Sequence, residues 1–109
     1  MDEQVGLALA EIEPELFLGN VYAAKAGHDH EFDHVLTVSE NAQPLTTDHQ
    51  PLRDNMTISY EQFEAAVELA RERYRGEGSL LIHCSAGLSR SVTVMATMLT
   101  AEGVYPSFE

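Results

Sequence analysis

The sequence has few basic residues, no long apolar run and a single cysteine. Lysine and arginine together number six, against 18 aspartates and glutamates, for a formal net charge of −12. Such an acidic surface repels nucleic acid and anionic membranes, so neither is an expected partner. No apolar run is long enough to cross a membrane, and the acidic N-terminus does not resemble a signal peptide. We therefore expect a cytoplasmic protein.

The single cysteine, Cys84, excludes an intrachain disulfide. A lone cysteine is most often a small buried apolar residue, so its neighbours must indicate whether it is reactive. The acidic excess has two interpretations. It is typical of proteins from salt-loving microbes, where high ionic strength screens self-repulsion, and it also occurs in acidic proteins of other organisms. We favour the first.

A chain of 109 residues, 44% of them apolar, predicts a single globular domain. Residues 12–19 are expected to form a short strand or hairpin, and residues 21–27 one or two helical turns. Residues 34–38 and 79–82 have the composition of buried strands. Residues 51–52 are expected to begin another short strand.

Two helices are expected. The first starts after Ser59 as its N-cap and ends before Gly76. Its apolar face consists of Phe63, Ala66, Val67, Ala70 and Tyr74. The second starts at Ser89 and ends near Gly103, and its apolar stripe consists of Val92, Met95, Ala96 and Leu99. This order of elements predicts an α/β fold with a central, mostly parallel sheet flanked by helices.

The segment between the last predicted strand and the second helix has the features of an anion site. In order, its residues are Cys84, Ser85, Ala86, Gly87, Leu88, Ser89 and Arg90. A loop that enters a helix N-terminus directs several backbone N–H groups at one point. Gly87 permits a positive φ, and the planar guanidinium of Arg90 can bind two phosphate oxygens. The same groups favour a thiolate at Cys84, placed for attack on phosphorus.

The pattern from His83 to Ser91, His-Cys-x5-Arg-Ser, resembles the signature of the protein tyrosine phosphatase superfamily. Residues 13–20, 35–39 and 52–55 are similar, in order, to segments of its dual-specificity branch. The resemblance extends from about residue 12 to residue 108, which is nearly the whole chain. It implies a phosphatase that needs no metal and no other cofactor.

The resemblance also implies a role for each matching residue. Cys84 would be the nucleophile that forms a phosphocysteine, and Arg90 would bind the phosphate. Ser91 would assist breakdown of that intermediate, and His83 would orient the loop through a hydrogen bond. Asp54 would act as general acid on the leaving group. The implied substrate is a phosphorylated protein, with phosphotyrosine first and phosphoserine or phosphothreonine second, or a small phosphate ester.

Several alternatives stay open. Asp48 competes with Asp54 as the general acid, and Ser91 also suits an ordinary position in the first turn of a helix. The histidines and acids of residues 28–34 match no strong metal-binding motif, so a solvated loop is the preferred interpretation. Residues 39–41 are expected to border the mouth of the substrate site.

Other functions also compete with a protein phosphatase. They are sulfur transfer of the rhodanese type, a binding module that holds phosphorylated partners without turnover, and a phosphatase acting on phosphoinositides, sugar phosphates or nucleotides. Residues 106–109 resemble the start of another helix. The chain is therefore expected to be a truncated domain without the last helices of the family, with part of its sheet exposed.

Overall fold

The structure, a computed structural model, describes residues 8–25, 31–52, 60–84 and 89–104. Within these ranges five strands form one sheet in the order β1-β2-β5-β3-β4. The strands are β1 (Leu9–Glu13), β2 (Leu16–Gly19), β3 (His34–Thr37), β4 (Asp48–His49) and β5 (Leu80–His83). β1 and β2 form an antiparallel hairpin, and the other neighbouring pairs are parallel. The predicted α/β fold with a mostly parallel sheet is confirmed.

Strand β5 lies at the centre of the sheet and is buried along its whole length. Its last residue, His83, is in register with Gly19 of β2 and Thr37 of β3. The parallel strands β2, β5, β3 and β4 therefore end at one edge, where Cys84 leaves β5. In open α/β sheets this carboxyl edge is the usual location of ligand sites.

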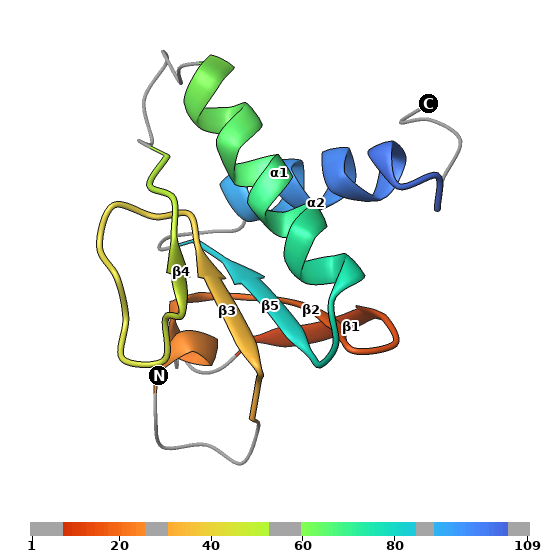
Figure 1. The fold of residues 1–109 in the computed structure, drawn as a ribbon. Coiled ribbons are helices and arrows are strands. Elements are labelled where there is room, and N and C mark those ends of the chain that lie inside the picture. Colours follow the sequence, from red (N-terminus) through yellow and green to blue (C-terminus); the bar gives the residue numbers. More distant parts are fainter. Residues whose placement is uncertain (1–7, 26–30, 53–59, 85–88, 105–109) are drawn as a thin grey trace.

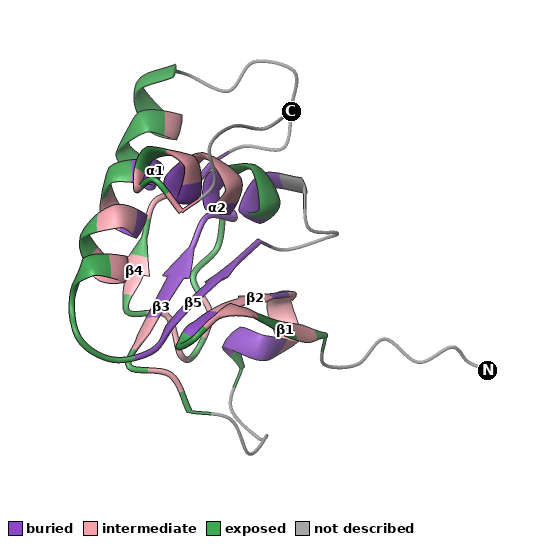
Figure 2. Ribbon diagram, turned by 90° about the vertical axis from the view of Figure 1, so that its right-hand side faces the viewer, coloured by how far each residue is buried: buried purple, intermediate pink, exposed green. Residues whose placement is uncertain are grey.

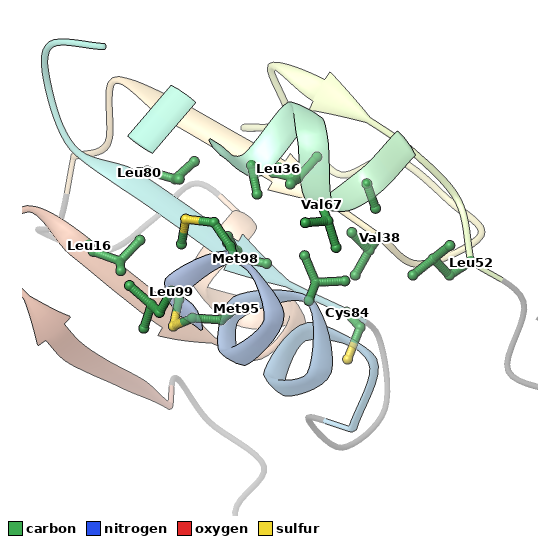
Figure 3. Packing of buried hydrophobic residues seen from close by; sticks show 14 residues of the cluster. Leu16, Leu36, Val38, Leu52, Val67, Leu80, Cys84, Met95, Met98 and Leu99 are labelled. Atoms are coloured by element: carbon green, nitrogen blue, oxygen red, sulfur yellow. The ribbon is translucent and has the colours of Figure 1, made fainter. Parts of the chain in front are cut away.

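Two helices, α1 (Tyr60–Arg75) and α2 (Ser89–Ala101), pack on one face of the sheet. The short 3-10 helix η1 (Val21–Ala24) packs on the opposite face, as Figures 1 and 2 show. Alternation along β5 supplies both faces, since Leu80 and Ile82 join the larger cluster and Leu81 joins the smaller one. Figure 3 shows the larger cluster enclosed between α1, α2 and the sheet.

The predicted apolar face of α1 is confirmed, with Ala66, Val67 and Ala70 buried. The predicted stripe of α2 is partly wrong, because Val92 is 42% exposed and Ala96 is only half-buried. The stripe is rotated so that its buried residues are Arg90, Ser91, Val94, Met95, Met98 and Leu99. This rotation turns the two polar residues of the first turn inward, where hydrophobic periodicity alone does not place them.

Helix α2 ends at Ala101, and Gly103 caps it, close to the predicted end. Gly103 has a φ of 80°, its N–H donates to the Thr100 carbonyl at 3.1 Å, and the Val104 N–H donates to the Leu99 carbonyl at 3.0 Å. These are the two hydrogen bonds of a Schellman cap, which suits glycine because of the left-handed conformation. Val104 then packs against the core beside α1 and α2.

Arginines near the end of α1 hold it to two other elements. Arg71 and Arg75 both contact Glu102, just beyond α2, with nitrogen–oxygen distances of 2.6 and 2.8 Å. Arg73 binds Asp48 of β4 through two parallel hydrogen bonds of 3.0 Å each. Bidentate pairs of this kind restrict geometry more than a single contact does. The arginines in the last turns of α1 therefore make tertiary contacts with β4 and with the end of α2.

The short strand expected at residues 51–52 is wrong in position, because the structure places β4 at Asp48–His49. Pro51 has no N–H to donate, so the sheet pattern is interrupted there. Single hydrogen bonds still hold the segment along β3, from the Gln50 N–H to the Thr37 carbonyl and from the Leu52 N–H to the Val38 carbonyl. Among the described residues, Tyr60 and Val92 are the exposed large apolar side chains.

Candidate active site

Cys84 lies immediately after β5, and its side chain is fully buried. Its Sγ is 3.4 Å from the Oγ of Ser91, in the first turn of α2. Figure 3 shows the sulfur at the end of the apolar cluster, beside the start of that helix. A strand, a short connection and a helix thus bring the thiol and the hydroxyl together. A hydroxyl at this distance can donate a hydrogen bond to a thiolate.

Arg90 is also turned inward and is only 6% exposed. Its Nη1 donates to the Leu52 carbonyl at 2.6 Å, across 38 positions of sequence. Arginine is seldom this buried, because taking its charge out of water is costly without a compensating interaction. A guanidinium at a helix N-terminus, at the carboxyl edge of a parallel sheet, can compensate that cost by binding an anion.

His83 is fully buried at the end of β5. Its Nδ1 lies 3.2 Å from the Cys84 carbonyl oxygen, and its Nε2 lies 2.7 Å from Thr37 Oγ1. Burial lowers the pKa of His83 below its usual 6.5, the contact with the Cys84 carbonyl opposes that shift, and nearby His49 adds to it. Sequence reasoning did not find Thr37. The available signal was a threonine in a buried strand, opposite His83 in the parallel register.

Asp48 does not suit the role of general acid. Hydrogen bonds from Arg73 lower the pKa of its carboxyl below 3.8, although partial burial opposes them, and Thr47 and the Arg73 charge add to the lowering. Its carboxylate is therefore held in the ionised form, with both oxygens committed to the guanidinium. A general acid needs the opposite, a proton available near the working pH.

Other predicted site residues lie outside the described part of the chain. Asp54 is one of them, as are Ser85, Ala86, Gly87 and Leu88. Ser89 begins α2, and its side chain is not described. A hollow of about 380 Å³ is lined by Glu40, Asn41, Pro51 and Gln62. Residues 40 and 41 thus border a hollow that is also lined by Pro51, the neighbour of Leu52 in the sequence.

No group of three or more metal-ligating side chains occurs among the described residues. Of the histidines and acids of residues 28–34, His34 and Asp33 are among the described residues, whereas residues 28–30 are not. Asp33 instead accepts hydrogen bonds from the N–H and hydroxyl of Ser79, at 2.8 and 3.3 Å.

In the described part of the chain, neither α1 nor α2 has the length and apolar character needed to cross a membrane.

Comparison with known proteins gives a consistent result. A family model described as "Polymorphic toxin system, DSP-PTPase phosphatase" matches residues 28–104. The chain is 30% identical over 109 residues to dual specificity protein phosphatase 15 of Mus musculus, covering 92% of this chain and 46% of that protein. It is 33% identical over 106 residues to dual specificity protein phosphatase 22 of Xenopus tropicalis, covering 88% and 50%.

Dual specificity protein phosphatase 1 of Arabidopsis thaliana is 32% identical over 97 residues, covering 81% of this chain and 49% of that protein. The chain thus spans about half the length of the curated relatives that it matches. Phosphatase names recur among these relatives, and the family match covers the described site residues from Thr37 to Ser91. The chain belongs to the dual-specificity phosphatase family of the cysteine-dependent protein tyrosine phosphatase superfamily.

Proposed function

We propose that this protein hydrolyses phosphate monoesters through a phosphocysteine intermediate on Cys84. The observation that carries the proposal is the 3.4 Å contact of Cys84 with Ser91 at the carboxyl end of β5, in the same first turn of α2 as the buried Arg90. A buried cysteine alone is equally typical of an inert core residue. A buried arginine and a hydroxyl 3.4 Å from the sulfur are not expected around an inert thiol.

In the first step the Cys84 thiolate attacks phosphorus, and the bond from phosphorus to the leaving oxygen breaks. Arg90 and the backbone N–H groups at the start of α2 hold the equatorial oxygens as their charge develops. Asp54 gives its proton to the leaving alkoxide or phenoxide. We assign this role to Asp54 because the rival acid, Asp48, is bound to Arg73.

In the second step water attacks the phosphocysteine, Asp54 takes up the proton of that water, and the phosphorus–sulfur bond breaks. The Ser91 hydroxyl donates a hydrogen bond to the departing thiolate from its position 3.4 Å away. Inorganic phosphate leaves, and the thiolate and protonated acid are restored. No step requires a metal ion.

The proposed substrates are phosphorylated proteins, with phosphotyrosine first and phosphoserine or phosphothreonine second. Phosphoinositides, sugar phosphates and nucleotides are the alternatives within the same chemistry. A cytoplasmic location is part of this proposal. A non-catalytic module that binds phosphorylated partners is the alternative outside catalysis, and the intact Cys84 counts against it.

Hydrolysis of an aryl phosphate by the wild-type protein and by Cys84→Ser tests the proposal. Wild-type turnover should persist in EDTA and be inhibited by vanadate, whereas Cys84→Ser should have no turnover and still bind vanadate. Ser79→Ala is a matched control, because Ser79 is a buried residue just before β5, at the strand end opposite Cys84, and its hydroxyl accepts from the Asp33 N–H. Full activity in Cys84→Ser would refute the mechanism. For an active wild-type protein, a panel of phosphopeptides and phospholipids would rank the substrates.

A further inference from the structure

A line of hydrogen bonds connects residues 43–46 with the carbonyl of Cys84. The Gln43 N–H donates to Thr46 Oγ1 at 2.8 Å, and the hydroxyl oxygens of Thr46 and Thr37 are 2.6 Å apart. Thr37 Oγ1 is 2.7 Å from His83 Nε2, and His83 Nδ1 is 3.2 Å from the Cys84 carbonyl oxygen. Neither threonine takes part in the two chemical steps above.

The direction of each hydrogen bond follows from the Cys84 end. A carbonyl oxygen can only accept, so the hydrogen on the His83 ring is at Nδ1. Because burial keeps the ring neutral, Nε2 is a bare acceptor, and Thr37 must donate its one hydroxyl hydrogen to it. The Thr37 oxygen then accepts from the Thr46 hydroxyl. All donors thus point the same way, toward Cys84.

The line begins in a turn that is itself held in place. The Thr46 N–H donates to the Gln43 carbonyl at 3.0 Å, and the Leu45 N–H donates to the Ala24 carbonyl of η1 at 2.9 Å. Thr37 and His83, further along, are both fully buried. Buried, fully connected hydrogen-bond chains restrict the orientation of every member. The Cys84 carbonyl is therefore held from the face of the sheet on which η1 packs, opposite α1 and α2.

We propose that Thr37 and Thr46 are positioning residues for the nucleophile, acting through His83 on the peptide unit that leads from Cys84 into the phosphate-binding loop. The inference rests on the proposed function, in which that loop binds the substrate phosphate. A peptide unit is planar, so holding its carbonyl also holds the direction of its N–H. Correct alignment of such donors matters most in the transition state.

Valine substitutions test this role, because valine keeps the shape of threonine and removes the hydroxyl. Thr37→Val and Thr46→Val should each lower kcat on an aryl phosphate, on the order of tenfold for Thr37→Val, with KM little changed. The pH midpoint for alkylation of Cys84 by iodoacetamide should move to higher pH, since a less aligned loop stabilises the thiolate less. Thr37→Ser and Thr46→Ser restore the hydroxyl and should restore both readouts.

Thr47→Val is the matched control. The Thr47 hydroxyl accepts from the Val35 N–H at 2.8 Å, in the same part of the sheet, but does not contact His83 or Thr37 in the described structure. This variant should lower the melting temperature and leave the alkylation midpoint and kcat unchanged. Thr46 is only half-buried, so Thr46→Val provides a folded variant if Thr37→Val does not fold.

The outcomes separate this inference from the proposed function. Alkylation does not need turnover, so it can be measured even if the wild-type protein is inactive. In that case the absence of turnover would refute the phosphatase, and a shifted alkylation midpoint in the valine variants would still support the hydrogen-bond line. A wild-type phosphatase whose valine variants keep the wild-type midpoint and kcat would refute the line alone. An equal shift in Thr47→Val would reduce the effect to general loss of structure and would also overturn the inference.

Discussion

The guanidinium of Arg90 donates a hydrogen bond of 2.6 Å to the carbonyl of Leu52. Leu52 is two positions before Asp54, the proposed general acid. The residue proposed to bind phosphate is therefore attached to the segment that leads to the proposed acid. One hydrogen bond links the two functional parts of the site, which are separated by α1 and β5 in the sequence.

Replacing Arg90 with lysine should disrupt this link while keeping the positive charge. Lysine lacks the planar fork that binds two phosphate oxygens and a carbonyl at once. We expect kcat/KM on an aryl phosphate to fall by about 100-fold or more, in line with the loss of a preorganised transition-state donor. Steady-state kinetics measure this, with Arg71→Lys as the control, since Arg71 contacts Glu68 and Glu102 away from the site. Near-wild-type kinetics in Arg90→Lys would contradict the assigned role.

A comparison of Asp54→Ala with Asp48→Asn tests the assignment of the acid. Asp54→Ala should slow the hydrolysis of alkyl phosphates, which have poor leaving groups, more than that of nitrophenyl phosphate. Asp48→Asn should keep the wild-type dependence on the leaving group and lower the melting temperature, because it removes the bidentate pair with Arg73. The reverse pattern in the two variants would make Asp48 the acid.

Local pattern predicted the strand before Cys84 and the helix after it, because β5 is a run of apolar residues and α2 is amphipathic. It misplaced β4, since a two-residue strand at Asp48–His49 has almost no pattern of its own. It also placed Val92 in the core of α2, because periodicity counts apolar residues and Arg90 and Ser91 are polar. Burial of those two residues follows from tertiary contacts with Leu52 and Cys84.

The hydrogen-bond line through Thr37 shows a second reason for incomplete prediction. Sequence reasoning gave His83 an orienting role but supplied no partner for its Nε2. That partner depends on strand order. β3 and β5 are neighbours in the sheet although β4 and α1 separate them in the sequence. Thr46 depends in addition on a turn fixed by Gln43 and η1. Non-local arrangements of this kind carry no short-range sequence signal.

Ser91→Ala should slow the second chemical step more than the first. The Ser91 hydroxyl is placed to stabilise the thiolate that leaves the phosphocysteine. Without it, phosphoenzyme should accumulate, so rapid-mixing experiments with nitrophenyl phosphate should show a burst of nitrophenol followed by a slower steady state. We expect kcat to fall by roughly 10-fold to 100-fold, with a smaller change in kcat/KM. A loss of kcat without any burst would indicate a structural role for Ser91.

The buried, neutral His83 should make the fold sensitive to mild acid. Its pKa in the folded protein is below 6.5, whereas in the unfolded chain it returns to about that value, so the unfolded state takes up a proton first as pH falls. The contribution to the free energy of unfolding is complete above pH 6.5 and is lost as pH falls toward the folded pKa. Protonation of Nε2 would also make it a donor to Thr37, so the hydrogen bonds of the Thr37 and Thr46 hydroxyls would have to reverse their direction.

Melting temperatures between pH 8 and about pH 5 test this with His83→Gln as the comparison. The wild-type protein should lose stability over this range, and the variant should lose less, so the difference between them should shrink as pH falls. Asp48 and Glu102 have pKa values below 3.8 and 4.5, respectively, so their titration belongs to more acidic conditions. A constant difference across the range would mean that His83 is not the titrating group.

The net charge of −12 leads to a prediction about salt. If the acidic surface is an adaptation to salt, self-repulsion should be relieved as the screening length falls from about 10 Å at 0.1 M to about 3 Å at 1 M. Salt also weakens the pairs of Glu102 with Arg71 and Arg75, but repulsion among 18 acidic residues should dominate. We therefore expect the melting temperature to rise by several degrees between 0.1 and about 2 M KCl, which corresponds to about 1 kcal/mol for a domain of this size.

A variant with fewer exposed acids separates screening from general salt effects on the folded state. Glu64, Glu72 and Glu77 are exposed, and changing all three to glutamine removes a quarter of the net charge. If repulsion is the cause, this variant should be more stable than the wild type at 0.1 M KCl, and its melting temperature should rise less steeply with salt. Parallel salt profiles for the two proteins would assign the effect to water and apolar burial instead, and a flat wild-type profile would exclude salt adaptation altogether.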